Sequence, residues 1–208
     1  GRFLGGRILK LVLASRNKGK LKELQSLLAG KGVEVLCLDD FQGIPEIRDT
    51  GTSFRENAVI KAKEASRLTG NLCLADDSGL EVDFLDGAPG VYSSRFAGME
   101  KDDAANNRKL LKLLEGIPAE RRTARFRCVI AIASPEGRVE TVEGICEGII
   151  GTQPKGTNGF GYDPLFIVAG QGYTMAELAP EVKNRISHRA KALKLAVPLL
   201  ETFKEREC

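Results

Sequence analysis

Two adjacent carboxylates, Asp76 and Asp77, are the residues of this sequence best suited to chemistry. The apolar residues 72–75 before them predict a short buried strand, and Ser78 and Gly79 predict a turn directly after them. Two buried carboxylates repel each other and lose hydration, so they need a metal ion, a basic side chain or solvent. A divalent metal is the simplest partner. The alternative is an Asp-Asp-Ser-Gly turn whose side chains only cap their own backbone.

A second polar segment, residues 15–20 (SRNKGK), connects a predicted strand over residues 9–14 to a predicted helix. The helix is indicated by leucines at helical spacing, namely Leu21, Leu24, Leu27 and Leu28. Such a turn presents free backbone N–H groups at a helix N-terminus, and Lys18 and Lys20 add positive charge, so the segment predicts an anion site. The Walker spacing is absent. A solvated turn with a Ser or Asn cap is the alternative.

Residues 151–163 (GTQPKGTNGFGYD) form a glycine-rich segment that contains two aromatic residues, Phe160 and Tyr162. An exposed ring in a glycine loop offers a stacking surface for a base, and a ring folded onto the core is an equally weighted alternative. Three basic residues precede the last predicted helix, namely Lys183, His188 and Arg189. A histidine next to an arginine at a helix start is more often a cap or a surface group than a ligand.

Three further helices are predicted beyond the first. The first begins at Ser53, which forms a capping box with Glu56. The second begins at Asp102 or Asp103, and the third follows Arg189. Asn57 and Lys61 share one face near the start of the first of these, where they face either a cleft or solvent. The helix after Asp102 is interpreted as purely architectural. The apolar residues expected to pack inward are Leu110, Leu111, Leu113 and Leu114 in that helix, and Ala192, Leu195, Ala196, Leu199 and Leu200 in the last.

Two β-rich runs, residues 124–133 and 139–150, are joined by a hairpin signal at residues 135–138. Arg125 and Arg127 alternate with apolar residues in the first run, so one face of that strand is apolar and the other is wet. The wet face either covers a groove or is simply solvated.

The composition bounds the class of protein. The chain has 208 residues, 42% of them hydrophobic, and a formal net charge of +3, which favours one globular domain over a nucleic-acid-coating surface. Five dispersed cysteines predict reduced thiols in an intracellular protein. The one histidine excludes a multi-histidine metal site and leaves oxygen ligands, hence magnesium, manganese or calcium. No apolar run approaches membrane-spanning length. Residues 1–7 are expected to be a flexible extension before a single domain over residues 8–208.

Six ordered motifs together resemble the family of inosine and xanthosine triphosphate pyrophosphatases. They are Ser15 to Lys20 (SRNKGK), Thr50 to Ala58 (TGTSFRENA), Ala75 to Gly79 (ADDSG), Gly87 to Gly90 (GAPG), Gly159 to Pro164 (GFGYDP) and Ser187 to Arg189 (SHR). The likeness covers nearly the whole chain beyond the first seven residues. Any one of these motifs would be weak, whereas six in order are specific.

The resemblance implies an α/β protein with a two-lobed fold around a long mixed β-sheet flanked by helices, related to Maf, with the active-site cleft between the lobes. It also implies hydrolysis of inosine, deoxyinosine and xanthosine triphosphates to the monophosphate and pyrophosphate with Mg²⁺. A cytoplasmic homodimer without membrane or nucleic-acid partners is expected.

The family pattern also implies roles for individual residues. Asp77 serves as metal ligand and base, and Lys20 stabilises the leaving pyrophosphate. Asp49 stands where the family usually has a glutamate metal ligand; Glu46 or a bridging water is the alternative. Phosphate is held within the turn of Ser15, Arg16, Asn17, Lys18, Gly19 and Lys20, and Ser78 contacts the nucleotide. The base is surrounded by Phe160, Gly161, Tyr162, Asp163, Lys183, His188 and Arg189.

Two other functions remain open at this stage. A Maf-like pyrophosphatase for modified pyrimidine nucleotides would use a similar phosphate turn and metal site. A nucleotide-sensing module would keep the lysine turn and the aromatic loop but would have no use for Asp77.

Overall fold

The computed structural model describes residues 8–205 of the chain. These residues divide into two compact units. Unit 1 contains the described residues up to 77, residues 129–142 and those from 194 onward, and unit 2 contains residues 78–128 and 143–193. The extension expected at residues 1–7 and the cysteine at position 208 lie outside the described residues.

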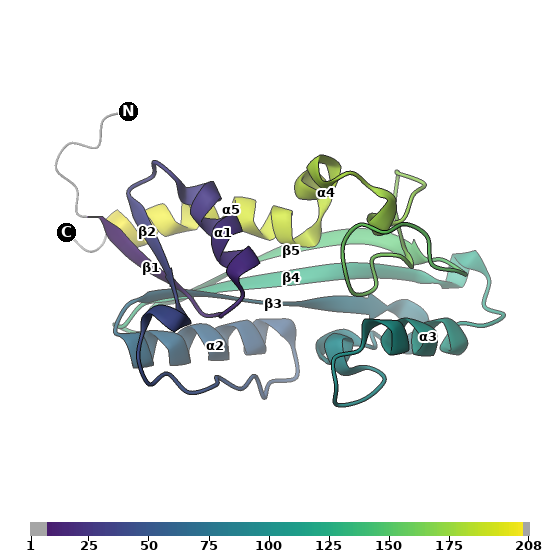
Figure 1. Ribbon diagram of the computed structural model, residues 1–208, viewed down its shortest axis with the longest axis horizontal. Helices are drawn as coiled ribbons and strands as arrows, with labels where there is room; N and C mark the ends of the chain where they lie inside the picture. The colour runs from purple at the N-terminus through teal and green to yellow at the C-terminus, as the bar shows by residue number, and fades with distance from the viewer. Residues whose placement is uncertain (1–7, 206–208) are drawn as a thin grey trace. The chain divides into compact units, whose positions relative to one another are not determined.

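The described strands form one mixed sheet in the order β2-β1-β3-β4-β5-β6. Strand β1 pairs in parallel with β2 and β3, and β5 pairs antiparallel with β6. The strands are β1 (Leu9–Leu13), β2 (Val33–Cys37), β3 (Leu72–Val82), β4 (Thr123–Ala133), β5 (Val139–Ile150) and β6 (Phe166–Val168). The α-helices are α1 (Lys18–Leu28), α2 (Phe54–Thr69), α3 (Asp103–Leu113), α4 (Pro180–Ile186) and α5 (His188–Glu205). The expected α/β class with a mixed sheet flanked by helices is confirmed (Figure 1).

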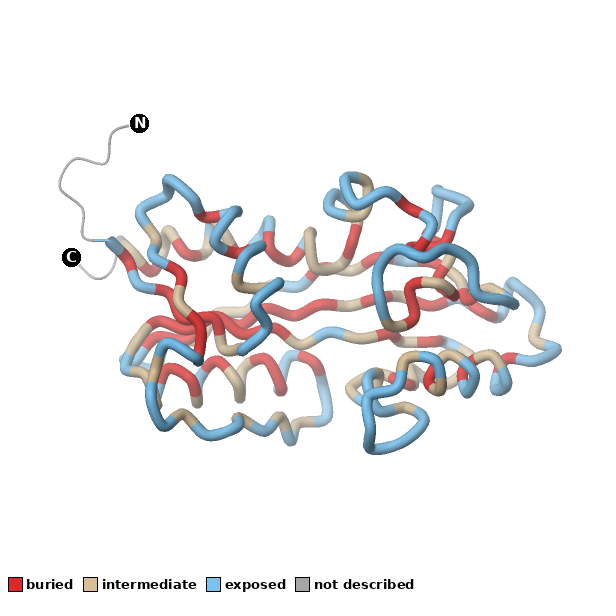
Figure 2. The backbone as a smooth tube through the Cα atoms, viewed as in Figure 1, coloured by how far each residue is buried: buried red, intermediate tan, exposed pale blue. Residues whose placement is uncertain are grey.

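Unit 1 places helices on both faces of its strands, with α2 on one side and the C-terminal part of α5 on the other (Figure 1). Val12 of β1 and Cys73 of β3 pack with Ala65 of α2. The neighbouring strand residues Leu11 and Leu13 are fully buried and point to the opposite face, because side chains alternate along a strand. Both faces of β1 therefore carry buried apolar side chains. Figure 2 shows the buried residues along the strands.

The turn expected at Ser78 and Gly79 is absent from β3. The strand continues without a turn through Ser78 and Gly79 to Val82, so Asp77 lies in the middle of a strand rather than at its end. The reason is that β3 lies inside the sheet, between β1 and β4. The pairing of β3 with β1 ends at Leu74, so pairing with β4 stabilises the later residues, whose own preference is for turns.

Unit 2 is built on the second half of β3 and on parts of β4 and β5. Helix α3 begins after Asp102, whose Oδ1 accepts a hydrogen bond of 3.0 Å from the Ala105 N–H. Its Leu110 and Leu114 are fully buried against Phe166 and the rest of this core. Lys183 lies within α4, and His188 and Arg189 form the first turn of α5, so these basic residues belong to helices instead of preceding them.

Three leucines that the sequence places in the core are exposed. Leu27 is 38% exposed, Leu113 44% and Leu195 52%. Each of them lies beside a stripe that does pack inward, such as Leu24 and Leu28 in α1, and a helix buries only that stripe. Among residues 8–205, no helix combines the length and the apolar character that a membrane span requires.

Candidate functional site

Asp76 and Asp77 lie in unit 1 and have different lysine partners. Lys20 Nζ lies 3.3 Å and 3.1 Å from the two carboxylate oxygens of Asp76. Lys61 Nζ donates to the Asp76 main-chain oxygen at 2.5 Å and lies 3.7 Å from Asp77 Oδ1. The basic side chains that a buried acidic pair requires are therefore present within the chain.

The Asp77 carboxylate is held in an unfavourable environment. Burial raises its pKa, and the charges of Asp49 and Asp76 raise it further, while Lys61 and the nearby Asn57 amide lower it; the net pKa lies above the ordinary value. Among the described residues, Asp77 Oδ2 is buried without a hydrogen-bond partner. A buried, unpaired carboxylate oxygen of this kind can accept a cation or a proton.

Helix α2 supplies the two side chains next to Asp77. Its N-terminus is fixed by Ser53, whose Oγ accepts a hydrogen bond of 3.1 Å from the Glu56 N–H. Asn57 is 3% exposed and accepts a hydrogen bond of 2.7 Å from the Gly51 N–H, and Lys61 follows one turn later on the same face. Asn57 and Lys61 were expected to face either a cleft or solvent. In the structure they lie against Asp77.

The turn between β1 and α1 has the predicted strand, turn and helix order. Asn17 caps α1, because its Oδ1 accepts a hydrogen bond of 3.0 Å from the Lys20 N–H. The Asn17 N–H in turn donates to Ser15 Oγ at 3.0 Å. The cap directs the start of α1 so that the Lys20 side chain reaches Asp76.

The other cations of this turn are paired with an aspartate. Arg16 Nη1 lies 2.6 Å from Asp39 Oδ1, and Lys18 Nζ lies 3.4 Å from Asp39 Oδ2. The Arg16 hydrogen bond holds the pKa of Asp39 below its usual value. Arg16 and Lys18 therefore form ion pairs with Asp39, whereas the Lys20 side chain points to Asp76.

The acidic residues of unit 1 fit a divalent cation whose coordination shell is completed by ligands from outside the protein. Asp49 is among the charges that act on Asp77. In residues 8–205, no group of three or more acidic, histidine or cysteine side chains forms a closed metal cage. Magnesium commonly binds one or two carboxylates and completes its shell with water and substrate phosphates, so this sparse donor set suits it. The roles of Asp77 and Asp49 as ligands stay predictions.

The glycine-rich loop of unit 2 is organised around Asp163, which is 6% exposed. Its Oδ2 accepts hydrogen bonds of 2.7 Å from Lys183 Nζ and 3.2 Å from the Phe160 N–H. Burial raises the pKa of Asp163 above the ordinary value although Lys183 lowers it. A Cβ at Gly159, where φ is +87°, would lie 2.2 Å from Asp163 Oδ2, so any other residue would strain the main chain and displace this carboxylate.

One aromatic residue of this loop is exposed and the other is packed in the core. Phe160 is 74% exposed, with Lys183 Nζ 5.3 Å from its ring centroid. Tyr162 is 6% exposed, and its hydroxyl donates to the Ser93 main-chain oxygen at 2.5 Å. Phe160 is thus the surface available for stacking, and Tyr162 is part of the core.

The remaining predicted base-binding residues lie in other surroundings. The His188 ring stacks on Phe126, with centroids 4.9 Å apart and planes at 20°. His188 and Arg189 begin α5, where Ser187 Oγ accepts a hydrogen bond of 3.1 Å from the Ala190 N–H. Ser78 is exposed on β3. The structure thus brings Phe160, Asp163 and Lys183 together and places His188 against Phe126.

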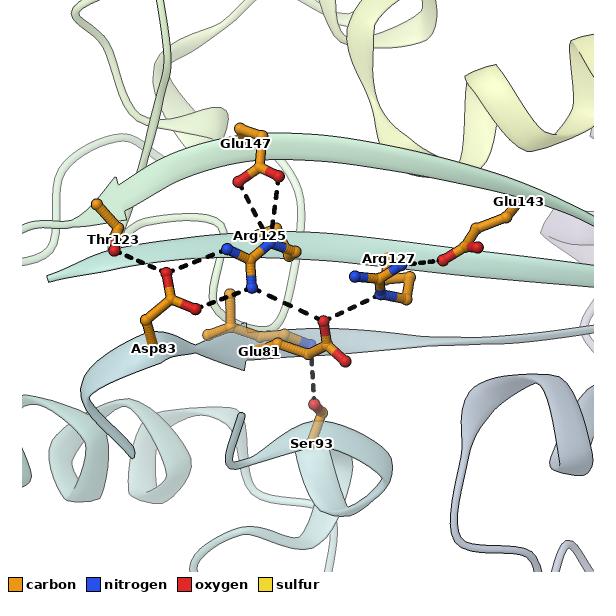
Figure 3. Close-up of polar contacts among 9 residues, drawn as sticks. Glu81, Asp83, Ser93, Thr123, Arg125, Arg127, Glu143 and Glu147 are labelled. Atoms are coloured by element: carbon orange, nitrogen blue, oxygen red, sulfur yellow. Dashed lines mark hydrogen bonds and ion pairs between the residues drawn. The ribbon is translucent and has the colours of Figure 1, made fainter. Parts of the chain in front are cut away.

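Arg125 and Arg127, on the wet face of β4, are bound to acidic residues of β3 and β5 and to Asp83, which directly follows β3 (Figure 3). Arg125 contacts Asp83 at 3.0 Å and Glu147 at 3.2 Å. Arg127 contacts Glu81 at 3.0 Å and also pairs with Glu143. These cross-strand pairs explain the alternation of β4 without a ligand.

Comparison with known proteins gives a family for this arrangement. A family model described as the Ham1 family matches residues 11–199. The chain belongs to the Ham1 family. The chain is also 60% identical to a dITP/XTP pyrophosphatase of Desulforamulus reducens, over 92% of this chain and 96% of that protein.

Solved structures of Ham1 proteins agree with this assignment. A HAM1 protein from Coxiella burnetii is 44% identical and matches with a TM-score of 0.88, over 93% of this chain and 99% of that one. A nucleoside-triphosphatase, or dITP/XTP pyrophosphatase, from Mycobacterium abscessus is 48% identical with a TM-score of 0.81, over 92% of this chain and all of that one. The resemblance stated from the six motifs is confirmed.

Sequence reasoning missed several contacts that support the site in this Ham1 protein. Asp76 pairs with Lys20, and Asp103 and Asn107 of α3 contact the main chain of Gly161. The contacts from α3 to Gly161 join residues 54 and 58 positions apart in the sequence, so no local spacing signals them. Asp103 was visible in the sequence as one of two candidate caps of α3, which is an ordinary structural role; in the structure Asp102 is the cap.

Proposed function

We propose that this protein hydrolyses inosine, deoxyinosine and xanthosine triphosphates to the monophosphate and pyrophosphate. The observation that carries the proposal is the 60% identity, over nearly the full length of both chains, to a protein named dITP/XTP pyrophosphatase. That name favours a purine substrate over the modified pyrimidines of a Maf-like enzyme. It also favours hydrolysis over mere sensing, and a hydrolase acting on a phosphoric anhydride agrees with the acidic and basic groups of unit 1.

The residues of unit 1 suit the handling of a triphosphate. The Lys20 ammonium and the N–H groups at the start of α1 offer positive charge to the pyrophosphate as negative charge develops on it. Asp76 holds the Lys20 side chain in a fixed direction through the ion pair of 3.1 Å. Lys61 lowers the pKa of the partly buried Asp77 carboxyl against the rise that burial causes, and this carboxylate can orient a water molecule toward the α-phosphorus.

Magnesium is proposed as the cofactor, held by Asp77 and Asp49. When bound there, it would supply positive charge that offsets the repulsion between these carboxylates and the triphosphate. The buried and unpaired Asp77 Oδ2 supports this proposal. Burial and carboxylate repulsion both raise the pKa of Asp77, and a bound cation would relieve the repulsion.

The loop of unit 2 suits the recognition of a purine base. The exposed Phe160 ring offers a flat apolar surface, and Lys183 supplies a donor beside it. Inosine and xanthosine carry an acceptor oxygen where adenine carries an amino donor. A donor at this position therefore favours the first two bases and leaves adenine unpaired.

Two further properties are proposed from the family resemblance alone. The protein is expected to act as a homodimer and to work in the cytoplasm. Gel filtration with light scattering tests the first, and a fluorescent fusion tests the second.

The experiment that tests the reaction follows both possible phosphorus products. Purified protein is incubated with inosine triphosphate, xanthosine triphosphate, ATP, GTP and a modified pyrimidine triphosphate, with and without magnesium. We expect pyrophosphate and the monophosphate from the first two substrates, only when magnesium is present. Release of orthophosphate with inosine diphosphate, or a preference for the pyrimidine, would contradict the proposal.

A further inference from the structure

Helix α3 holds the peptide groups of Gly161 from both sides. The Gly161 N–H donates a hydrogen bond of 3.0 Å to Asp103 Oδ2, and the Gly161 carbonyl accepts one of 3.1 Å from Asn107 Nδ2. Asp103 and Asn107 are four residues apart, so they lie on the same face of the helix. The main chain of one loop residue is therefore fixed by two side chains of one rigid element.

The residues on either side of Gly161 are the ones with opposite exposures. Phe160, before it, is 74% exposed, and Tyr162, after it, is 6% exposed. The Phe160 N–H is bound by Asp163, and the Tyr162 hydroxyl is bound by the Ser93 carbonyl. Fixing Gly161 completes an anchored run of three residues from which only the Phe160 ring extends into solvent.

The other end of α3 is tied to the beginning of the same loop. Arg122, which is 4% exposed, donates to the Leu114 carbonyl at 2.5 Å just after α3 ends. It also donates to the Ile150 carbonyl at 2.7 Å and the Gly151 carbonyl at 2.6 Å. Helix α3 is thus joined both to the start and to the tip of the loop, which makes it a brace for the loop.

The side chain of Asn107 contains a group that destabilises the fold. Its Oδ1 is buried and, among the described residues, has no hydrogen-bond partner. An unsatisfied buried acceptor destabilises a protein, so the fold alone gives no reason for this amide. Its donor, in contrast, has a specific use at Gly161.

We infer that Asp103 and Asn107 are positioning residues that hold Phe160 as the stacking surface for the purine base. The inference rests on the proposed function, because it takes Phe160 as the residue that meets the base. A loop released from α3 would present the ring in the binding orientation for only part of the time. The apparent dissociation constant of the nucleotide rises in proportion to that loss.

The inference separates base binding from phosphate binding. The triphosphate is assigned to the turn of residues 15–20, which belongs to unit 1, whereas α3 and the glycine-rich loop belong to unit 2. Loss of the α3 contacts should therefore weaken the binding of the whole nucleotide. The affinity for inorganic tripolyphosphate, which has no base, should stay the same.

The test uses Asp103→Ala and Asn107→Ala in the full chain. We expect the Gly161 amide to exchange its hydrogen about tenfold faster in Asp103→Ala, and KM for inosine triphosphate to rise about tenfold in both variants. We expect kcat to change by less than about threefold, and the inhibition constant of tripolyphosphate by less than about twofold. Asn107→Ala should keep its melting temperature, because the mutation also removes the unsatisfied oxygen.

Two matched variants accompany them. Asp103→Asn retains an oxygen that can accept from the Gly161 N–H, so it should restore KM to within about threefold of the parent value. Arg108→Ala changes an exposed residue of the same helix and should leave both KM and amide exchange unchanged.

The outcomes distinguish the failure of this inference from that of the proposed function. Unchanged exchange at Gly161, or faster exchange with an unchanged KM, would overturn the positioning role. An equal loss of affinity for tripolyphosphate would also overturn it, because the effect would then be general unfolding. A parent protein that does not hydrolyse inosine triphosphate would instead refute the proposed function, and this is measured first.

Discussion

Burial and charge act on Asp77 in opposite directions. Burial is the largest influence that raises its pKa, and Lys61 is the largest that lowers it, with a net rise. Relative to the unfolded chain, folding therefore shifts the equilibrium of Asp77 toward the neutral acid. The ionised form that the proposed chemistry needs is maintained against the preference of the fold, which is common at functional sites.

This balance predicts that Asp77→Asn separates activity from stability. The amide cannot ligate a cation as a carboxylate does, so turnover should fall by about 100-fold or more. The neutral side chain removes a buried charge of the same shape, so the melting temperature, measured with a chelator present, should stay equal or rise. Asp86→Asn makes the same change at an exposed site and should alter neither quantity. A lower melting temperature in Asp77→Asn would mean that this carboxylate stabilises the fold.

The glycine-rich loop depends on close approach at one position. A Cβ at Gly159 would meet Asp163 Oδ2 at 2.2 Å and Lys183 Nζ at 2.8 Å. Gly159→Ala should therefore destabilise the protein by about 2 kcal/mol or more and weaken nucleotide binding. Gly170→Ala is the control, because φ there is +79° but nothing lies within 4 Å of the added Cβ; it should cost only about 1 kcal/mol. Chemical denaturation measures both, and equal losses would contradict the clash.

The arginine network of β4 belongs to the sheet and not to the reaction. The hydrogen bonds that Arg125 donates to Asp83 raise the pKa of Arg125, so its charge is committed to this network. Arg125→Met should lower the free energy of unfolding by about 1 kcal/mol, less at high salt, and leave KM for inosine triphosphate unchanged. Arg108→Met provides the comparison at an exposed position without such partners. A raised KM in Arg125→Met would place this side chain near the substrate.

Local elements were predictable from the sequence more completely than the contacts between them. The cap at Ser53 and the polar turn before α1 both follow from spacing, because the start of a helix is decided by a few neighbouring residues. The turn expected at Ser78 and Gly79 failed, since pairing within the sheet outweighed local preference.

The candidate site shows the same division. The polar turn and the acidic pair of unit 1 were found because each is continuous in sequence. The contact of Lys20 with Asp76 joins residues 56 apart, and spacing alone does not reveal it. The choice between an exposed and a buried aromatic in the loop of unit 2 depended on burial, which only the structure supplies.

For the molecule as a whole, the sparse donor set predicts that magnesium, the proposed cofactor, would be needed for turnover and not for folding. Structural metal sites close around several side chains, and residues 8–205 contain no such group. A chelator should therefore abolish pyrophosphate release while it changes the melting temperature by less than about 2 °C. Calorimetry with and without the chelator measures this. A large drop on chelation would show that the metal holds the fold together.

The exposure of Phe160 has a practical consequence, because the chain contains no tryptophan. Phe160→Trp would introduce a single indole fluorophore at the tip of the loop. A purine stacked on the indole should quench its emission, and adding tripolyphosphate should leave the signal unchanged. The dim or bright state of one side chain would then report directly whether a base is docked there.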